Sequence, residues 1–177
     1  DLRVDVGYST GGRVGLELKE QKVSGPVAAA LDDQSVVLVT GGAKGLGLKF
    51  AKALAAKYRC AIVLSGRSAE SAETAKACAA VKAEGARECR YQALDVRNAK
   101  SVNEGVGTVK AGFGRLDAIV HSAGVIADAL IAKKDAAGLD SVIEPKVAGA
   151  LSLLEAAHGL KLFGGVGSWA GRFGNAG

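Results

Sequence analysis

Three closely spaced glycines are the residues in this sequence best suited to binding a phosphate group. Gly41, Gly45 and Gly47 belong to the run Thr40-Gly41-Gly42-Ala43-Lys44-Gly45-Leu46-Gly47. Glycine lets the backbone turn tightly, so that N–H groups at the start of a following helix can approach a pyrophosphate. A glycine pattern alone is a weak sign of such a site, because ordinary turns also contain glycine. The neighbouring elements must therefore decide.

The elements on either side of the glycines fit a nucleotide site. Residues 36–39 read Val-Val-Leu-Val and offer no polar side chain to solvent, which predicts a strand buried on both faces. Residues 48–57 are rich in good helix formers and place Phe50 and Leu54 at helical spacing. A strand, a glycine turn and a helix in this order predict a dinucleotide-binding unit.

A cation follows the second predicted strand. Residues 61–64 form another buried apolar run, and Ser65, Gly66 and Arg67 come directly after it. In the usual NAD-binding pattern an acidic residue here holds the ribose 2′-hydroxyl, whereas a guanidinium pairs well with a 2′-phosphate. The alternative is a solvated surface arginine. We prefer the cofactor interpretation because no carboxylate stands at this strand end, and it predicts NADPH as the cofactor.

The third predicted strand, residues 89–94, ends at Asp95 and Val96. Asp95 and Val96 would meet the adenine ring if the nucleotide lies across this edge of the sheet. Asp95 would equally serve as the cap of the helix that follows. The sequence leaves both alternatives open.

The fourth predicted strand, residues 116–120, ends in mostly small residues, as expected where a cofactor lies flat across the sheet edge. These cofactor-binding candidates are His121, Ser122, Ala123 and Gly124. His121 has no candidate metal partner nearby in the sequence, so we expect it to pack or to form hydrogen bonds.

Strands alternate with helices along most of the chain. Further helices are expected at 69–84, 99–110, 129–134 and 139–157, and a fifth strand at 160–166. This alternation predicts an α/β fold with a Rossmann-like, doubly wound parallel sheet, whose strands end on one edge where ligands bind. Residues 1–20 predict a β-hairpin, and residues 21–33 a linker. We therefore expect two parts: a subdomain end with its linker at 1–33, and a nucleotide-binding domain at 34–177.

Composition narrows the function classes. The net charge of +5 is scattered over predicted helices and aromatic residues make up only 5% of the chain, which argues against nucleic acid as the main partner. No apolar run is long enough to span a membrane, and no signal peptide opens the sequence. The spacing of Cys60, Cys78 and Cys89 matches no metal site and predicts reduced thiols in a cytoplasmic protein. A start at Asp1 without any Met predicts a piece of a longer polypeptide.

The motifs, taken together and in order, resemble the ketoreductase domain of type I polyketide synthases or polyunsaturated fatty acid synthases, within the short-chain dehydrogenase/reductase superfamily. The resemblance covers residues 35–177, and the Pro145-Lys146-Val147-Ala148-Gly149-Ala150 run is its most specific part. The initial hairpin resembles the end of the structural subdomain that precedes such ketoreductases. The remaining matching runs are Thr40 to Gly47, Ser65 to Arg67, Asp95-Val96, His121 to Gly124 and Gly167 to Gly177.

The resemblance implies chemistry for two further residues. Ser168 would hydrogen-bond the substrate carbonyl, and Lys146 would bind the nicotinamide ribose and assist proton delivery. A tyrosine would donate the proton while NADPH gives hydride to a 3-oxoacyl thioester on an acyl carrier protein, beside the other domains of the synthase. The family places that tyrosine after Gly177, and Tyr8, Tyr58 and Tyr91 lie in the wrong elements to replace it. The 177-residue chain alone is therefore expected to be inactive.

One feature departs from the family pattern, and two other functions compete with this assignment. Gly164 and Gly165 stand where the family has bulky apolar residues, and two glycines should weaken a central strand. A non-catalytic nucleotide-binding or structural domain is the main alternative, because a fold can be kept without its chemistry. A stand-alone dehydrogenase of small alcohols is a third candidate, against which the leading hairpin and linker argue.

Overall fold

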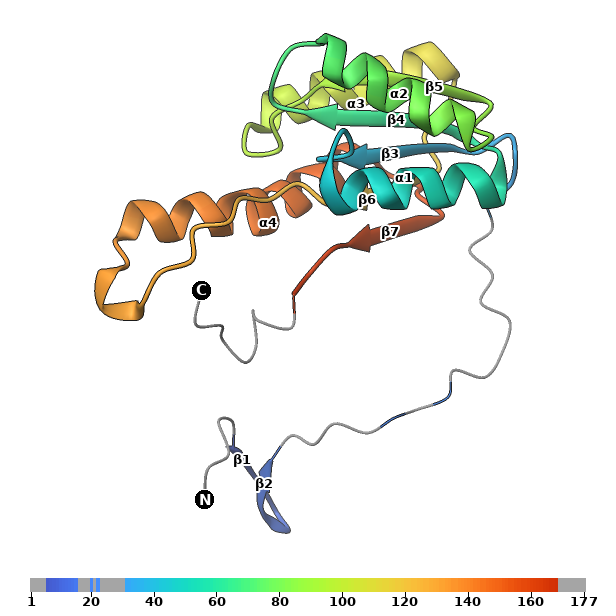
Figure 1. Ribbon diagram of the computed structural model, residues 1–177. Coiled ribbons are helices and arrows are strands. Elements are labelled where there is room, and N and C mark those ends of the chain that lie inside the picture. Colours follow the sequence, from blue (N-terminus) through green and yellow to red (C-terminus); the bar gives the residue numbers. More distant parts are fainter. Residues whose placement is uncertain (1–5, 16–19, 21, 23–30, 169–177) are drawn as a thin grey trace.

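A computed structural model describes residues 6–15, 20, 22 and 31–168 of the chain. Its main body is a parallel five-stranded sheet with the strand order β5-β4-β3-β6-β7 (Figure 1). The strands are β3 (Val36–Thr40), β4 (Ala61–Gly66), β5 (Glu88–Ala93), β6 (Ala118–His121) and β7 (Leu162–Gly165). The order reverses direction beside β3, which is where α/β sheets of this kind bind their ligands. The predicted Rossmann-like doubly wound sheet is confirmed.

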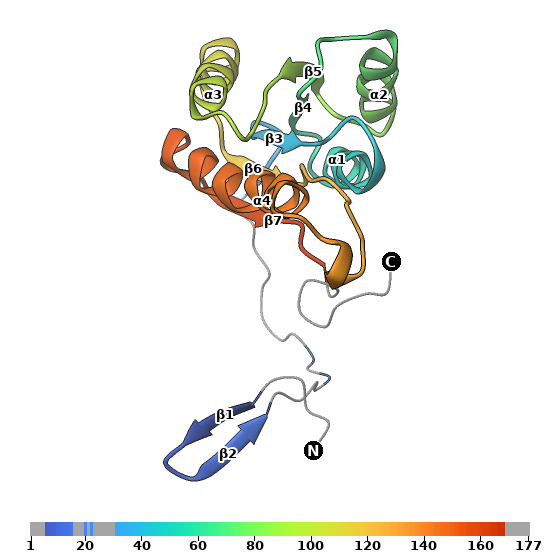
Figure 2. The ribbon, with the colours of Figure 1, turned by 90° about the vertical axis from the view of Figure 1, so that its left-hand side faces the viewer.

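Helices cover both faces of this sheet. Helices α1 (Gly45–Tyr58) and α2 (Ala72–Ala83) lie on one face, and α3 (Ala99–Phe113) and α4 (Ala136–Ala156) lie on the other, as Figure 2 shows from the end where the strands finish. All five residues of β3 are buried, because their alternating side chains enter one apolar core on each face of the sheet. The central strand therefore holds both layers in place.

The N-terminal residues form a separate two-stranded antiparallel sheet. Strand β1 (Val6–Ser9) pairs with β2 (Gly12–Gly15), so the predicted hairpin is present in a shorter form. Most of the predicted linker, and the outer parts of the expected hairpin at 1–5 and 16–19, lie outside the described residues.

The ends of the helices follow capping rules. Ser71 and Thr74 form a reciprocal capping box at the start of α2, and Asn98 and Asp135 accept hydrogen bonds from the first turns of α3 and α4. Helix α1 differs, since its N-cap residue, Lys44, makes no side-chain cap hydrogen bond. The side chain of the N-cap residue therefore accepts no hydrogen bond from the first N–H groups of α1.

Two predicted elements differ in length from the observed ones. The helix expected at 129–134 is only a 3₁₀ turn, η1 (Ile131–Lys133), because the Asp135 cap starts α4 directly after it. The fifth strand is confined to Leu162–Gly165, although it contains both Gly164 and Gly165. Within the described residues β7 pairs only with β6, so the glycines lie in an outer strand of this sheet. No helix among the described residues combines the length and apolar character needed to cross a bilayer.

Candidate functional site

A groove of about 480 Å³ lies at the edge where the parallel strands end. Nine of the residues predicted from the sequence line it, and they come from the ends of four different strands. These nine are Thr40, Gly41, Lys44, Ser65, Arg67, Asp95, Val96, Ala123 and Gly124. Convergence of residues so far apart in the chain is what a parallel sheet predicts for a ligand site.

The glycine loop is shaped by close backbone packing. Gly41 has a positive φ of 64°, and a Cβ atom there would lie 2.9 Å from the Cα atom of Ala123. A Cβ atom on Gly47 would collide with the carbonyl group of Gly41. Gly42, Gly45, Leu46 and Gly47 do not line the groove themselves; the last three begin α1, and an added Cβ atom on Gly42 would lie 2.6 Å from the Val39 carbonyl oxygen.

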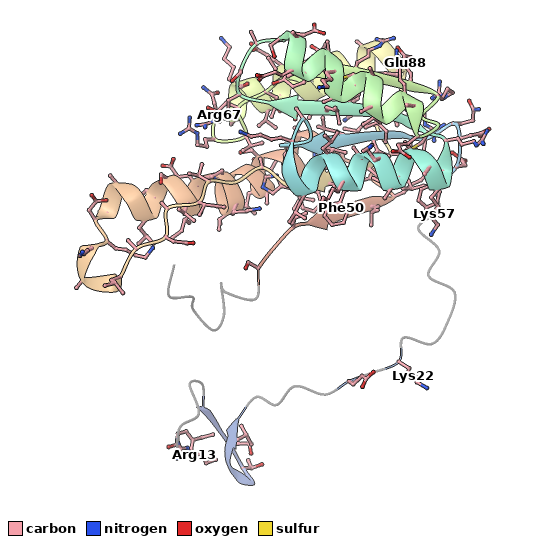
Figure 3. The ribbon with its side chains drawn as sticks, in the orientation of Figure 1. Arg13, Lys22, Phe50, Lys57, Arg67 and Glu88 are labelled. Atoms are coloured by element: carbon pink, nitrogen blue, oxygen red, sulfur yellow. The ribbon has the colours of Figure 1, made fainter. Side chains whose placement is uncertain are left out.

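Arg67 lies in the loop after β4. The carbonyl groups of Ser65 and Gly66 accept hydrogen bonds from the N–H groups of Gly42 (3.2 Å) and Leu94 (2.8 Å), which fix the backbone up to Gly66. The Arg67 side chain is exposed at the groove, whereas Lys57 and Glu88 lie toward the opposite end of the sheet (Figure 3). The geometry thus presents a guanidinium to whatever occupies the groove.

Ser65 provides an independent sign of a ligand. Its side chain is 1% exposed, and its hydroxyl oxygen is the one buried side-chain polar atom without a hydrogen-bond partner in the part of the chain that the structure describes. Leaving a buried hydroxyl unpaired costs about 1–3 kcal/mol. Because Ser65 also lines the groove, a bound molecule with a polar group at this position would satisfy it.

Asp95 is already paired in the structure. Its carboxylate accepts hydrogen bonds from the Arg97 guanidinium at 3.1 and 2.8 Å and from the Arg97 backbone N–H at 3.0 Å. The hydrogen bonds from Arg97 hold the pKa of Asp95 below its ordinary value. Asn98, and not Asp95, caps α3, so the cap alternative is wrong.

Arg97 is a groove residue that the sequence reasoning missed. It lines the groove together with Lys44 and Arg67, and Asp95 and Glu73 supply negative charge in the same wall. The spacing Asp95-x-Arg97 was the available signal, because two residues so close after a strand end can form a two-pronged ion pair.

His121 is buried and joins three elements. Its Nδ1 atom lies 2.8 Å from the Thr40 hydroxyl, and its Nε2 atom lies 2.8 Å from the Pro145 carbonyl oxygen. A carbonyl can only accept, so Nε2 carries the proton. Thr40 accepts from the Ala123 N–H at 3.2 Å, which leaves its own hydrogen for Nδ1.

This arrangement has two consequences for His121. Burial lowers its pKa, so the neutral ring is favoured. The ring does not line the groove, and both of its nitrogens are bonded within the protein, as expected for a hydrogen-bonding histidine. It connects the end of β3 to the turn of α4 that precedes Lys146.

Lys146 lies where β6 and β7 end. Its ammonium group donates a hydrogen bond of 2.8 Å to the Val166 carbonyl oxygen, two residues before Ser168. Its stem packs against Gly124, where an added Cβ atom would lie 2.8 Å from the Lys146 Cε atom. Burial lowers the pKa of Lys146. Lys146 does not line the groove itself, but its ammonium lies beside the loop that leads to Ser168.

Ser122 and Ser168 complete the predicted set. The Ser122 N–H donates to the Thr40 carbonyl at 3.1 Å, which ties the end of β6 to β3, and Ser168 is exposed in the loop after β7. Neither lines the groove. The remainder of the predicted glycine-rich run, residues 169–177, lies outside the described residues.

Several known proteins are similar to this chain. It is 37% identical to polyketide synthase PksN of Bacillus subtilis over 147 residues, and this alignment covers 82% of the chain and 3% of PksN. It is 36% identical to polyketide synthase ThaG of Burkholderia thailandensis over 150 residues, and this alignment covers 83% of the chain and 3% of ThaG. The chain therefore spans only a small part of these curated relatives.

Solved structures agree with the sequence matches. A ketoreductase domain from the bacillaene assembly line has a TM-score of 0.79 and 33% identity, with 97% of this chain and 41% of that chain covered. An N-terminal ketoreductase from the macrolactin assembly line has a TM-score of 0.78 and 35% identity, with 93% and 33% covered. Xylitol dehydrogenase with bound NAD⁺ has a TM-score of 0.72 and 28% identity, with 81% and 56% covered.

The model of the KR domain family matches residues 35–177, a range that includes all five strands of the parallel sheet and the residues that line the groove. The likeness to a dehydrogenase with bound NAD⁺ agrees with a nicotinamide site on this type of fold. The chain therefore belongs to the KR family, the ketoreductase domains of polyketide synthases, which are oxidoreductases of the short-chain dehydrogenase/reductase fold.

Proposed function

We propose that this chain is the cofactor-binding part of a ketoreductase that uses NADPH to reduce a 3-oxoacyl thioester, carried by an acyl carrier protein, to the 3-hydroxyacyl form. The observation that carries the proposal is the groove at the strand ends, with a guanidinium, Arg67, where NAD-binding proteins carry an acidic residue. Relatives such as PksN and ThaG are polyketide synthases, which supports neighbouring synthase domains as partners. The cytoplasm is the location that we propose with this function.

The residues present fit a phosphorylated dinucleotide. Helix α1 begins at the groove without a side-chain cap and would meet the pyrophosphate, and Arg67 would pair with the 2′-phosphate. Ser65, whose buried hydroxyl has no partner, would gain one from the bound nucleotide. When bound, NADPH supplies the hydride.

Lys146 and Ser168 would act on the substrate side. The Ser168 hydroxyl would hydrogen-bond the substrate carbonyl, and Lys146 would bind the nicotinamide ribose after exchanging its Val166 partner. Its lowered pKa, caused by burial, suits a lysine that assists proton delivery. Tyr91 is not the proton donor in this scheme, since its hydroxyl donates to the Ser68 carbonyl. We expect that donor in the longer protein, so the 177-residue chain alone should not turn over.

Two measurements test this proposal. Titration of the chain with NADPH and NADH should give tighter binding of NADPH, and equal affinities would contradict the cofactor assignment. The full-length protein should oxidise NADPH in the presence of a 3-oxoacyl thioester, and Lys146→Met should lower turnover by about 10² or more, the usual contribution of acid–base assistance. Steady turnover by the 177-residue chain itself would overturn the assigned roles.

A non-catalytic nucleotide-binding domain is the second candidate. The observation that favours it is the pair Gly164 and Gly165 in β7, just before the Ser168 loop, where the family has bulky apolar residues. The same two measurements separate the candidates, since this one predicts nucleotide binding by the chain without turnover in the full-length protein.

A further inference from the structure

Tyr91 of β5 holds the residues on either side of Arg67. Its hydroxyl donates a hydrogen bond of 2.8 Å to the carbonyl oxygen of Ser68. The phenol oxygen of Tyr91 would also lie 2.9 Å from a Cβ atom placed on Gly66. One phenol therefore contacts the residue before Arg67 and the residue after it.

The Ser68 contact lies between two other anchors of this loop. The Gly66 carbonyl is fixed by the Leu94 N–H at 2.8 Å, and from Ser71 onward the chain is fixed by the capping box of α2. Arg67 and Ser68 fall in the interval, where the backbone has no regular secondary structure. Tyr91 is thus placed to limit the movement of this short segment.

The state and position of the phenol suit this task. Burial raises the pKa of Tyr91, so the hydroxyl remains protonated and able to donate. Tyr91 lines the groove and also a second hollow, which is formed mainly by residues of α2 and β5. Glycine at position 66 leaves the space that the hydroxyl needs.

We propose that Tyr91 is a positioning residue that sets the preference for a 2′-phosphorylated dinucleotide by fixing the loop that carries Arg67. The inference rests on the proposed function, in which Arg67 pairs with that phosphate. A tethered arginine loses less conformational freedom on binding than a free one, so the tether favours the ligand that uses Arg67. NADH has no 2′-phosphate and gains little from it.

The test compares NADPH and NADH binding by the chain and by its Tyr91→Phe variant, using fluorescence titration of each cofactor. Tyr91→Phe keeps the ring and removes only the hydroxyl. It should weaken NADPH binding about 3- to 10-fold, the range for loss of one hydrogen bond, and change NADH binding by less than about 2-fold. Tyr58→Phe, the same change in α1 away from the groove, is the matched control and should change neither affinity.

A double-mutant cycle asks whether Tyr91 acts through Arg67. In an Arg67→Ala background, Tyr91→Phe should have no further effect on NADPH affinity. A loss that persists in this background, or an equal loss for both cofactors, would show that Tyr91 merely stabilises the fold and would overturn the inference. If the wild-type chain itself binds NADPH and NADH equally, the proposed cofactor preference fails and the inference fails with it. A wild-type preference that Tyr91→Phe leaves intact overturns the inference alone.

Discussion

Asp117 and Ser65 lie at opposite ends of the parallel sheet, and they differ in whether the protein itself supplies their hydrogen-bond partners. At the end where the strands begin, Asp117 is 5% exposed, and its carboxylate accepts hydrogen bonds from the Val36 N–H at 3.0 Å and from Arg115 at 2.7 Å, with Lys161 at 3.4 Å. At the end where they finish, Ser65 has an unpaired buried hydroxyl and Arg67 is exposed. Asp117 and its partners satisfy one another at the first end, whereas the Ser65 hydroxyl and the Arg67 guanidinium remain available to a ligand at the second.

Backbone hydrogen bonds of Asp117 also link three strands at the end where the strands begin. The Asp117 N–H donates to the Val36 carbonyl at 2.9 Å, and the Asp117 carbonyl accepts from the Lys161 N–H at 2.8 Å. A single residue before β6 therefore connects the starts of β3 and β7. One sheet geometry therefore serves stability at one edge and, in the proposed function, binding at the other, so substitutions at the two edges should separate these properties.

The largest effect is expected for Asp117→Ala. The change leaves the Val36 N–H and two cations without their shared partner, so the free energy of unfolding should fall by about 2–3 kcal/mol, below the usual figure for a buried pair because the cations are partly exposed. Urea denaturation measures this loss. Glu104→Ala, which removes an exposed carboxylate paired with Lys100, should change stability by less than about 0.5 kcal/mol.

The dependence of the free energy of unfolding on pH below neutrality provides a second test for Asp117. Burial alone would raise its pKa, but hydrogen bonds from Arg115, the Val36 N–H and Lys161 outweigh burial and hold the pKa below its ordinary value. The stabilisation is therefore present above the unfolded-state pKa of about 4 and is lost as the pH falls through the folded-state value. Asp117→Ala should flatten this part of the curve. A large loss of NADPH affinity in this variant would contradict the separation of the two edges.

Arg67→Ala should produce the converse pattern. NADPH affinity should fall about 10- to 100-fold, as expected for loss of a charge-assisted hydrogen bond of roughly 1.5–3 kcal/mol, while the urea midpoint stays unchanged because the side chain is exposed. Calorimetric titration and urea denaturation measure the two properties. Lys57→Ala removes a cation toward the opposite end of the sheet and serves as the control. An equal loss of NADPH affinity in the control would point to general electrostatic attraction.

His121 should link the binding edge to stability through pH. Burial lowers its pKa and the nearby Lys146 charge acts in the same direction; together they outweigh the hydrogen bond to the Pro145 carbonyl, which raises the pKa. The unfolded chain takes up a proton below pH about 6.5 that the folded chain does not, so folding stability should decrease as the pH falls from 7 toward 5, by up to about 1.4 kcal/mol per pH unit.

Replacement of His121 isolates its contribution to the pH dependence of folding stability. His121→Gln keeps an amide donor and an acceptor but cannot titrate, so the decrease in stability between pH 7 and 5 should become shallower than in the wild type. His158→Gln is the control, because His158 is exposed after the end of α4. The same slope in wild type and His121→Gln would show that other groups carry the pH dependence.

Much of the fold and of the site could be predicted from local patterns. The run at 36–39 predicted β3 because an apolar, β-branched segment between turn signals fits a buried strand. Topology then carried the prediction further, since parallel strands bring Thr40, Ser65 and Ala123 to one edge. Cofactor roles for the individual residues remain predictions.

What could not be predicted depends on contacts that local pattern does not encode. Asp95 is a residue type that often caps helices, but α3 begins only at Ala99, so Asn98 is its cap and Asp95 pairs with Arg97 instead. In α4, Val147 and Leu151 are exposed while Leu153 is buried. Apolar residues occur on more than one face of this helix, so periodicity could not show which face enters the core.

The smallest effect concerns a thiol at the edge where the strands begin. Cys60 precedes β4 directly, its side chain is fully buried, and burial raises its pKa. Little thiolate is therefore present at neutral pH, and alkylation by iodoacetamide requires opening of the structure around it. We expect slow alkylation of Cys60 in the wild type, followed by mass spectrometry of the modified peptide. Because the Asp117 network closes the same edge, Asp117→Ala should accelerate this reaction, whereas Arg67→Ala should not. Equal acceleration by both variants would show that the two edges open together, and the comparison between them would then fail.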